Sequence, residues 1–193
     1  MSAVPAIAFS HLGIHVTDLA RMRAFYTGVF RFTVTDEGLL ERPDGSKADL
    51  VFLSHDPRDH HQLVLAAGRP ADLSFNIVNQ ISFRVPDLDG LRALHARLAA
   101  HGVDEVHPVT HGNAVSLYFH DPEGNRIEVF FDTPWYVNQP LVVPVDLGQT
   151  DDELMRAVER HARALPGFQP IEQWRARIAE RMRADQAGET TAD

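Results

Sequence analysis

The alternation of apolar and polar positions near the start of the chain occurs a second time further along it. Residues 11–19 (HLGIHVTDL) align with residues 80–88 (QISFRVPDL) at an offset of 69, so that Asp18 meets Asp87. In both copies apolar residues fall on every second position, which is the period of a strand with one buried face. The pattern therefore predicts two copies of one structural unit in place of a single irregular fold.

Each copy continues from its first strand into a helix. Apolar residues follow at helical spacing, at positions 19, 22 and 25 and again at 88, 91, 94 and 98. Asp18 and Asp87 directly precede these stretches and are expected to cap the two helices, because their carboxylates can accept from unpaired amides of the first turn.

Apolar runs and turn sequences complete each unit. The segments RPDGS (42–46) and DPEGN (121–125) separate apolar runs and are typical of tight turns between antiparallel strands. We interpret each unit as a βαβββ module, one over about 9–68 and one over about 78–134, joined by the polar stretch 68–76. The predicted fold is α+β, with a domain over 1–134 in which the two modules form a cup-shaped mixed sheet.

Strand alternation places polar side chains on the sheet face opposite the helices. His11 and His15 share that face in the first copy, and Gln80, Ser82 and Arg84 share it in the second. An ordinary core excludes such residues unless they are paired. The face is therefore either exposed to solvent or the lining of a polar cleft, and the long apolar final strands favour a cleft.

Four polar positions are related by the repeat. Pairing the final strands at an offset of 66 matches Gln62 with Glu128, as the first strands match His11 with Gln80. A twofold relation between rigid strands can bring donor atoms to one point. Imidazole with carboxylate suits iron, manganese, nickel or zinc and leaves positions open for substrate. Because the four are far apart in sequence, their spacing alone does not define a metal site.

Two motifs make the chain resemble the vicinal oxygen chelate superfamily, which includes glyoxalase I, extradiol dioxygenases and fosfomycin- or bleomycin-resistance proteins. The first is His11-x4-Val16-x-Asp18-Leu19 followed by Phe25-Tyr26, and the second is SLYFHDPEGNRIE over 116–128. With His111-Gly112 before the second motif, the chain is most similar to small one-domain extradiol ring-cleavage dioxygenases. The resemblance covers about residues 9–134.

This resemblance implies a set of metal ligands. Extradiol enzymes hold Fe(II) with two histidines and a glutamate, leaving positions for a catecholate and O₂. His11 matches the first histidine and Glu128 the glutamate, whereas Gln80 stands where the second histidine is expected. Glutamine is a ligand in some glyoxalase I enzymes, so we predict His11, Gln80 and Glu128 as ligands of Fe(II), with Zn, Mn or Ni as alternatives. His15 or His61 substituting for Gln80, or feeble metal binding, are the other outcomes. The residues expected to line the cleft are Gln62, His15 and Arg84.

The resemblance also implies two catalytic residues. Tyr118 matches a tyrosine that hydrogen-bonds the metal-bound substrate oxygen, and His111 matches a histidine that exchanges a proton with the same oxygen. A histidine with a pKa near 6.5 is suited to deprotonating a catechol. Purely structural roles are the alternative for these residues: Glu128 would form an ion pair with Arg84 or Arg126, and the Tyr118 hydroxyl would form a local hydrogen bond.

Three functions fit these residues. The first hypothesis is an Fe(II)-dependent extradiol-type dioxygenase that cleaves a catechol-like aromatic with O₂. The second is a metal-dependent lyase or isomerase of the glyoxalase type, which needs a carboxylate base where Gln62 stands. The third is a metal-free or weakly metal-binding protein that sequesters an aromatic ligand, an interpretation that both glutamines favour.

The amino-acid composition limits the classes of partner that the protein is expected to bind. The 193 residues are 44% hydrophobic and 23% charged, as in globular proteins, and the net charge of −9 argues against non-specific nucleic-acid binding. The apolar runs fall short of the roughly 20 residues of a membrane span, and MSAVPAIAFS has no basic start typical of a secretory signal. Without cysteine there is no disulfide framework, thiolate nucleophile or cysteine-ligated zinc. We expect a cytoplasmic protein, a homodimer, with no nucleic-acid or membrane partner.

Residues 135–193 lie outside the repeat and form a C-terminal extension with two predicted helices. Thr150 to Glu153 (TDDE) is a capping box that opens the first, and the second is expected to begin near Pro170. The tail over 185–193 is predicted to be disordered. The helices could form a lid, a dimer contact or a cover for the sheet, and covering or dimerisation is our prediction.

Overall fold

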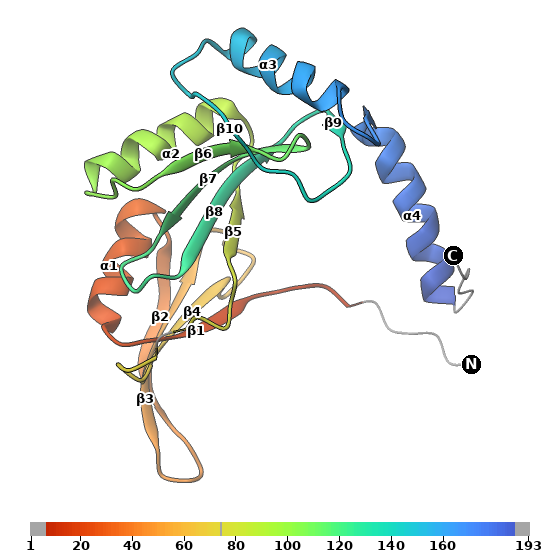
Figure 1. Ribbon diagram of the computed structural model, residues 1–193. Coiled ribbons are helices and arrows are strands. Elements are labelled where there is room, and N and C mark those ends of the chain that lie inside the picture. Colours follow the sequence, from red (N-terminus) through yellow and green to blue (C-terminus); the bar gives the residue numbers. More distant parts are fainter. Residues whose placement is uncertain (1–6, 74, 188–193) are drawn as a thin grey trace.

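The computed structural model describes residues 7–73 and 75–187, and it confirms the α+β class with two βαβββ units in sequence (Figure 1). The first unit consists of β1 (Leu12–Val16), α1 (Leu19–Val29), β2 (Thr33–Glu41), β3 (Lys47–Ser54) and β4 (Leu63–Ala67). The second consists of β5 (Ile81–Arg84), α2 (Leu88–Ala100), β6 (His107–Thr110), β7 (Ala114–His120) and β8 (Arg126–Asp132).

The two units share one strand topology. The first sheet has the order β1-β4-β3-β2, and the second has the order β10-β6-β7-β8-β5, in which β10 (Val143–Pro144) is an added edge strand. In both, the first strand of the unit pairs in parallel with the last, and the other pairings are antiparallel. The parallel pairing leaves β1 and β5 as edge strands of two separate hydrogen-bonded ladders.

Both helices lie on one side of the strands (Figure 1) and begin where the sequence predicts. The Asp18 carboxylate accepts from the amide of Arg21, and the Asp87 carboxylate accepts from the amide of Gly90, both at 2.9 Å. The helix-facing strand positions are fully buried and form one core, in which each such side chain contributes about 1.5–3 kcal/mol. Residues of this core that are less than 2% exposed include Val16, Leu53, Leu65, Leu117 and Ile127.

The strand registers correct one predicted equivalence. Leu12 lies opposite Leu63 on β4, and its repeat partner Ile81 lies opposite Ile127 on β8. Glu128 therefore corresponds to Val64 in the first unit, two residues beyond the predicted Gln62. The cause is a longer connection, since residues 54–62 join β3 to β4 where residues 120–126 join β7 to β8. Because strand side chains alternate with period two, the shift preserves the face but changes the residue.

The C-terminal extension consists of short strands and two helices: β9 (Trp135–Tyr136), β10, α3 (Asp151–Arg163), β11 (Gln169–Pro170) and α4 (Ile171–Ala187). The predicted capping box is present at α3, where Thr150 and Glu153 bond reciprocally. The residues of α4 are not buried, and this helix extends away from the two sheets (Figure 1).

The C-terminal helix α4 is joined to the body by the Trp174 ring, which stacks on Tyr136 with centroids 4.9 Å apart. Residues 185–187 belong to α4, so the predicted disorder is wrong for them, and 188–193 lie outside the described residues. Within the described part of the chain, each helix is too short or too polar to cross a membrane.

Candidate functional site

A cluster of hydroxyl and amide donors surrounds the carboxylate of Glu128 on β8. Its Oε1 atom accepts from the Ser116 hydroxyl at 2.9 Å and from the Tyr118 phenol at 2.7 Å. Its Oε2 atom accepts from the Ser82 hydroxyl at 2.7 Å and from the Gln80 amide at 2.9 Å. Glu128 is only 7% exposed, so these four bonds supply the partners that a buried carboxylate needs.

Strand pairing explains why these side chains meet. Glu128 lies directly opposite Ser82 on β5 and directly opposite Tyr118 on β7. Ser116 is two residues from Tyr118 and therefore shares its face of the sheet. The alternation that buries Leu117 and Ile127 against the helices thus turns the polar set toward the opposite face.

His111 completes this cluster from the loop between β6 and β7. Its Nδ1 atom lies 2.6 Å from the Leu141 carbonyl, so Nδ1 carries a proton and donates. Its Nε2 atom lies 3.0 Å from the Tyr118 hydroxyl and 3.4 Å from Oε1 of Glu128. The next residue, Gly112, has φ +77° and packs so closely on Val137 that an added Cβ would lie 2.4 Å from it. Glycine is therefore required beside the histidine.

Opposing effects set the charges of the cluster. Burial alone would raise the pKa of Glu128, but hydrogen bonds from His111, Ser82, Tyr118 and Ser116 outweigh burial and hold it at about 2. The hydrogen bond to Glu128 raises the pKa of His111, and burial followed by the bond to Glu128 raises that of Tyr118. At neutral pH the cluster therefore holds a carboxylate anion and a neutral phenol.

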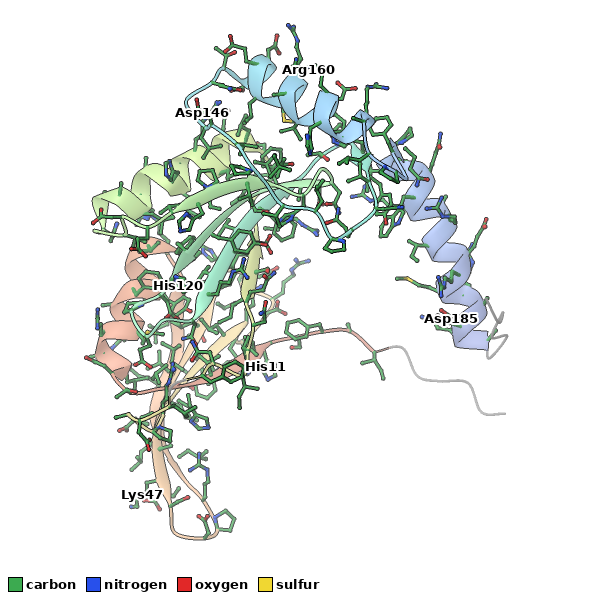
Figure 2. All side chains as sticks on the ribbon, in the orientation of Figure 1. His11, Lys47, His120, Asp146, Arg160 and Asp185 are labelled. Atoms are coloured by element: carbon green, nitrogen blue, oxygen red, sulfur yellow. The ribbon has the colours of Figure 1, made fainter. Side chains whose placement is uncertain are left out.

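The other predicted site residues lie outside this hydrogen-bonded cluster. His11 is exposed where the chain enters β1 (Figure 2), and its ring centroid is 4.2 Å from that of His61. His15 is exposed on β1. Gln62 accepts from the His55 amide at 3.0 Å, and Arg84 pairs with Asp132 at 3.5 Å. The structure therefore brings together Gln80, His111, Tyr118 and Glu128.

The side chains predicted as metal ligands are engaged with other partners in this arrangement. Over residues 7–73 and 75–187, no group of three or more His, Asp or Glu side chains is placed to hold a metal ion. Each carboxylate oxygen of Glu128 already accepts two hydrogen bonds. Gln80 presents its NH₂ group, which is a donor and cannot ligate a metal, to the carboxylate. Ligation by His11, Gln80 and Glu128 stays a prediction.

Sequence reasoning missed three members of the site. Ser82 and Ser116 have the strand parity of the polar face, which was a usable signal, but nothing in the sequence shows that both bind Glu128. The guanidinium of Arg126 lies over the Tyr118 ring, 4.3 Å from its centroid. Arg126 shares the face of Glu128 on β8, two residues away, and only its predicted role as an ion-pair partner drew attention to it.

A cavity of about 1040 Å³ lies between the two modules, next to the cluster. Gln80 and Ser82, which bind Glu128, also line this cavity. Most of its wall is apolar, and the phenylalanine rings of Phe30 and Phe83 approach to 4.8 Å. The apolar part of the wall lies on the helix side of β5, because Phe83 alternates with Ser82, whose side chain bonds Glu128. Its apolar lining residues include Val29, Phe30, Phe32, Phe83, Val85 and Leu94.

Hydrogen bonds hold the modules together on the side away from this cavity. The Oε1 atom of Glu123 accepts from the amides of Thr17 and Asp18, both at 2.7 Å, at the start of α1. Nearby, the buried Tyr26 hydroxyl donates to Asp121 at 3.0 Å. The turn between β7 and β8 is thus fixed on the first module.

The internal repeat does not reproduce that contact on the opposite side. The turn at Asp56 matches the turn at Asp121, since each aspartate accepts from the amide two residues on, which places Arg58 where Glu123 stands. Arginine has no acceptor, and Pro86 replaces Thr17 and has no amide hydrogen, so the bond cannot form. Pro86 and His55 instead line the cavity, which therefore occupies the side without the contact.

Residues 8–129 match the Glyoxalase/Bleomycin resistance protein/Dioxygenase superfamily. The chain is 26% identical over 136 residues to biphenyl-2,3-diol 1,2-dioxygenase 2 of Rhodococcus globerulus, covering 68% of this chain and 65% of that protein. It is 28% identical over 137 residues to biphenyl-2,3-diol 1,2-dioxygenase 3 of the same organism, covering 68% and 66%. The chain thus spans just under two thirds of the length of these two relatives.

Solved structures show the same fold. A glyoxylase/bleomycin resistance protein/dioxygenase domain from Frankia sp. EAN1pec matches with a TM-score of 0.54 and 22% identity, covering 67% of this chain and all of that one. The fosfomycin resistance protein FosX from Listeria monocytogenes matches with a TM-score of 0.51 and 20% identity, covering 67% and 96%. The chain belongs to the glyoxalase/bleomycin resistance/dioxygenase superfamily, a largely enzymatic group.

Proposed function

We propose that this protein is an Fe(II)-dependent extradiol-type dioxygenase that cleaves a catechol-like aromatic with O₂. The observation that carries the proposal is the ionised, buried Glu128, bonded by Tyr118 and approached by His111, next to the cavity that Gln80 and Ser82 line. Its relatives named as biphenyl-2,3-diol dioxygenases support an aromatic diol as the substrate class. The cavity has room for a substrate larger than a single ring.

The chain's own residues are suited to bind a diol and to move its proton. Because the Leu141 carbonyl holds the proton of His111 on Nδ1, the Nε2 atom is the one that exchanges protons on the site side. Tyr118 stays a neutral phenol, since its pKa is raised, and can donate to an ionised substrate oxygen.

The proposed metal is Fe(II), with Zn, Mn or Ni as alternatives and with His11, Gln80 and Glu128 as ligands. Since His11 contacts His61 and not the Glu128 cluster, the proposal requires His11 to reach Glu128. Either the modules must move relative to each other, or a second copy of the chain must supply the histidine. The predicted homodimer and cytoplasmic location remain parts of this proposal.

Iron content and oxygen uptake test the proposal together. Protein reconstituted anaerobically with Fe(II) and desalted is expected to retain about one iron per chain and to consume O₂ with a panel of catechols, giving a ring-cleaved product. Glu128→Gln and His11→Ala are each expected to abolish both. His161→Ala removes an exposed imidazole on α3 and is the matched control. Failure to retain iron, together with no oxygen uptake, contradicts the proposal.

A second candidate is a metal-free protein that binds an aromatic ligand. It is favoured by the four hydrogen bonds that already occupy Glu128, because the carboxylate is satisfied without a metal. Tight binding of a catechol in the presence of a chelator, with no oxygen uptake after iron loading, would support it. A glyoxalase-type lyase or isomerase has less support, because Val64 and not a carboxylate matches Glu128 in the first module.

A further inference from the structure

Arg126 presents a cation directly beside the proposed catalytic groups. Its guanidinium lies 4.3 Å from the centroid of the Tyr118 ring, whose hydroxyl bonds Glu128. Arg126 is exposed at the first position of β8, opposite His120, so one side of the guanidinium is open to solvent. A substrate oxygen held by Tyr118 and His111 would therefore place its ring close to this cation.

The other arginines of the second module are already paired. Arg84 pairs with Asp132 at 3.5 Å, Arg92 bonds Asp151, and Arg97 donates to the carbonyls of residues 28 and 29. Among the described residues, by contrast, no carboxylate forms an ion pair with Arg126, although the chain carries a net charge of −9. Its guanidinium contacts the π face of Tyr118, which leaves its N–H donors available.

We propose that Arg126 determines specificity by binding a carboxylate on the ring of the aromatic diol, so that the substrate class is a carboxylated catechol. A guanidinium is suited to this role because its planar fork can donate two parallel hydrogen bonds to one carboxylate. The site then has two parts with different roles. Tyr118, His111 and Glu128 act at the diol, while Arg126 recognises the anionic substituent. This inference rests on the proposed function, because it takes the diol to bind at Tyr118.

Anaerobic binding measurements distinguish recognition of the substrate's carboxylate charge from recognition of its aromatic ring. The full chain, with and without Fe(II), is titrated calorimetrically with 2,3- and 3,4-dihydroxybenzoate and with their uncharged methyl esters. The wild type is expected to bind at least one acid more tightly than its ester. Arg126→Gln is expected to weaken binding of that acid about 10- to 100-fold and to leave the ester unchanged. Arg126→Lys is expected to fall between, because it keeps the charge and loses the fork.

Arg156→Gln is the matched control, since it makes the same change at an arginine of α3 that is paired with Asp152 at 3.1 Å and does not line the cavity. It is expected to keep the preference for the acid. Circular dichroism melts of all three variants check that they are folded. Equal weakening of acid and ester by Arg126→Gln would mean that the arginine only supports Tyr118, and would overturn the proposal. A preference lost in Arg156→Gln, or absent from the wild type, would overturn it as well.

Oxygen uptake on the same samples distinguishes the two proposals. Discrimination between acid and ester that depends on Arg126, without oxygen uptake after iron loading, leaves this inference standing and overturns the dioxygenase. Oxygen uptake with equal preference for acid and ester upholds the dioxygenase and overturns this inference. If neither acid nor ester binds, this inference is overturned, while oxygen uptake with the catechol panel still decides the dioxygenase.

Discussion

Tyr118 and Glu128 lie directly opposite each other on β7 and β8, and the phenol donates a 2.7 Å hydrogen bond to Oε1 of the carboxylate. Ten residues separate them in sequence, but one antiparallel pairing places them side by side. His111 touches both from the preceding loop. The reactive part of the candidate site is therefore built within the second module, which makes it testable independently of how the first module contributes.

Removing the charge of Glu128 is expected to destabilise the protein. In Glu128→Gln, an amide NH₂ faces donors that now bond a carboxylate oxygen, and leaving such buried donors unpaired costs about 1–3 kcal/mol in the free energy of unfolding. Urea denaturation measures the change. Glu172→Gln, at an exposed position of α4, is the control and is expected to change stability by less than about 0.5 kcal/mol. Equal stability of Glu128→Gln and wild type would contradict the proposed stabilisation by the hydrogen bonds to Glu128.

The same carboxylate predicts an acid dependence of stability. The pKa of Glu128 is about 2 in the folded state and about 4.3 in an unfolded chain, so the folded state binds the proton less readily. Its contribution is complete above pH 4.3 and is lost as pH falls through about 2. The stability difference between wild type and Glu128→Gln is therefore expected to be constant between about pH 4.3 and 6.5 and to shrink below pH 4.3. A difference that grows as pH falls below 4.3 would refute the assignment.

His111 is expected to titrate above the ordinary value of about 6.5, because its hydrogen bond to Glu128 raises its pKa. The stabilisation that this bond gives is complete below pH 6.5 and is lost as pH rises through the pKa of the folded state. NMR titration of the imidazole C–H signals measures this pKa. In Glu128→Gln the pKa of His111 is expected to fall toward 6.5.

The sequence predicts the parts of the fold that depend on local periodicity. The repeat, the caps at Asp18 and Asp87 and the sharing of one face by Tyr118 and Ser116 follow from strand and helix periods, and the structure agrees. The equivalence of Gln62 and Glu128 fails, because the length of a connection sets the register of β4 and periodicity cannot detect a two-residue shift.

Contacts between the modules cannot be predicted from strand and helix periodicity. That Glu123 binds the start of α1 depends on how two separately folded units dock, and no local pattern encodes the docking. The separation of His11 from the Glu128 cluster has the same origin, since the two lie in different modules. A resemblance supplies candidate ligands position by position, whereas their convergence in space depends on the interface.

Replacing Gly112 is expected to disrupt the loop that positions His111. In Gly112→Ala, the new Cβ would lie 2.4 Å from the Val137 side chain at a φ of +77°, so both a clash and backbone strain are introduced. We expect a loss of about 2–4 kcal/mol in the free energy of unfolding. Gly124→Ala is the control, because Gly124 has the same φ but open space around it, and it is expected to lose only about 1 kcal/mol. Similar losses in both would show that the contact with Val137 is unimportant.

The contact between modules gives the last prediction. Glu123→Ala leaves the amides of Thr17 and Asp18 without their acceptor, and it removes the charge that faces Arg69 at 3.6 Å. We expect urea denaturation to show a loss of about 1–3 kcal/mol, and hydrogen exchange to show faster opening at the start of α1.

Arg58→Ala tests the asymmetry that leaves the cavity open. Arg58 occupies the matching place in the first module, but its side chain is 86% exposed and pairs only with Asp56. It is expected to change stability by less than about 0.5 kcal/mol and to leave exchange at the start of α2 unaltered. If Arg58→Ala destabilised the protein as much as Glu123→Ala, the two sides of the interface would be energetically alike. The cavity could then not be ascribed to the contact that Arg58 and Pro86 fail to form.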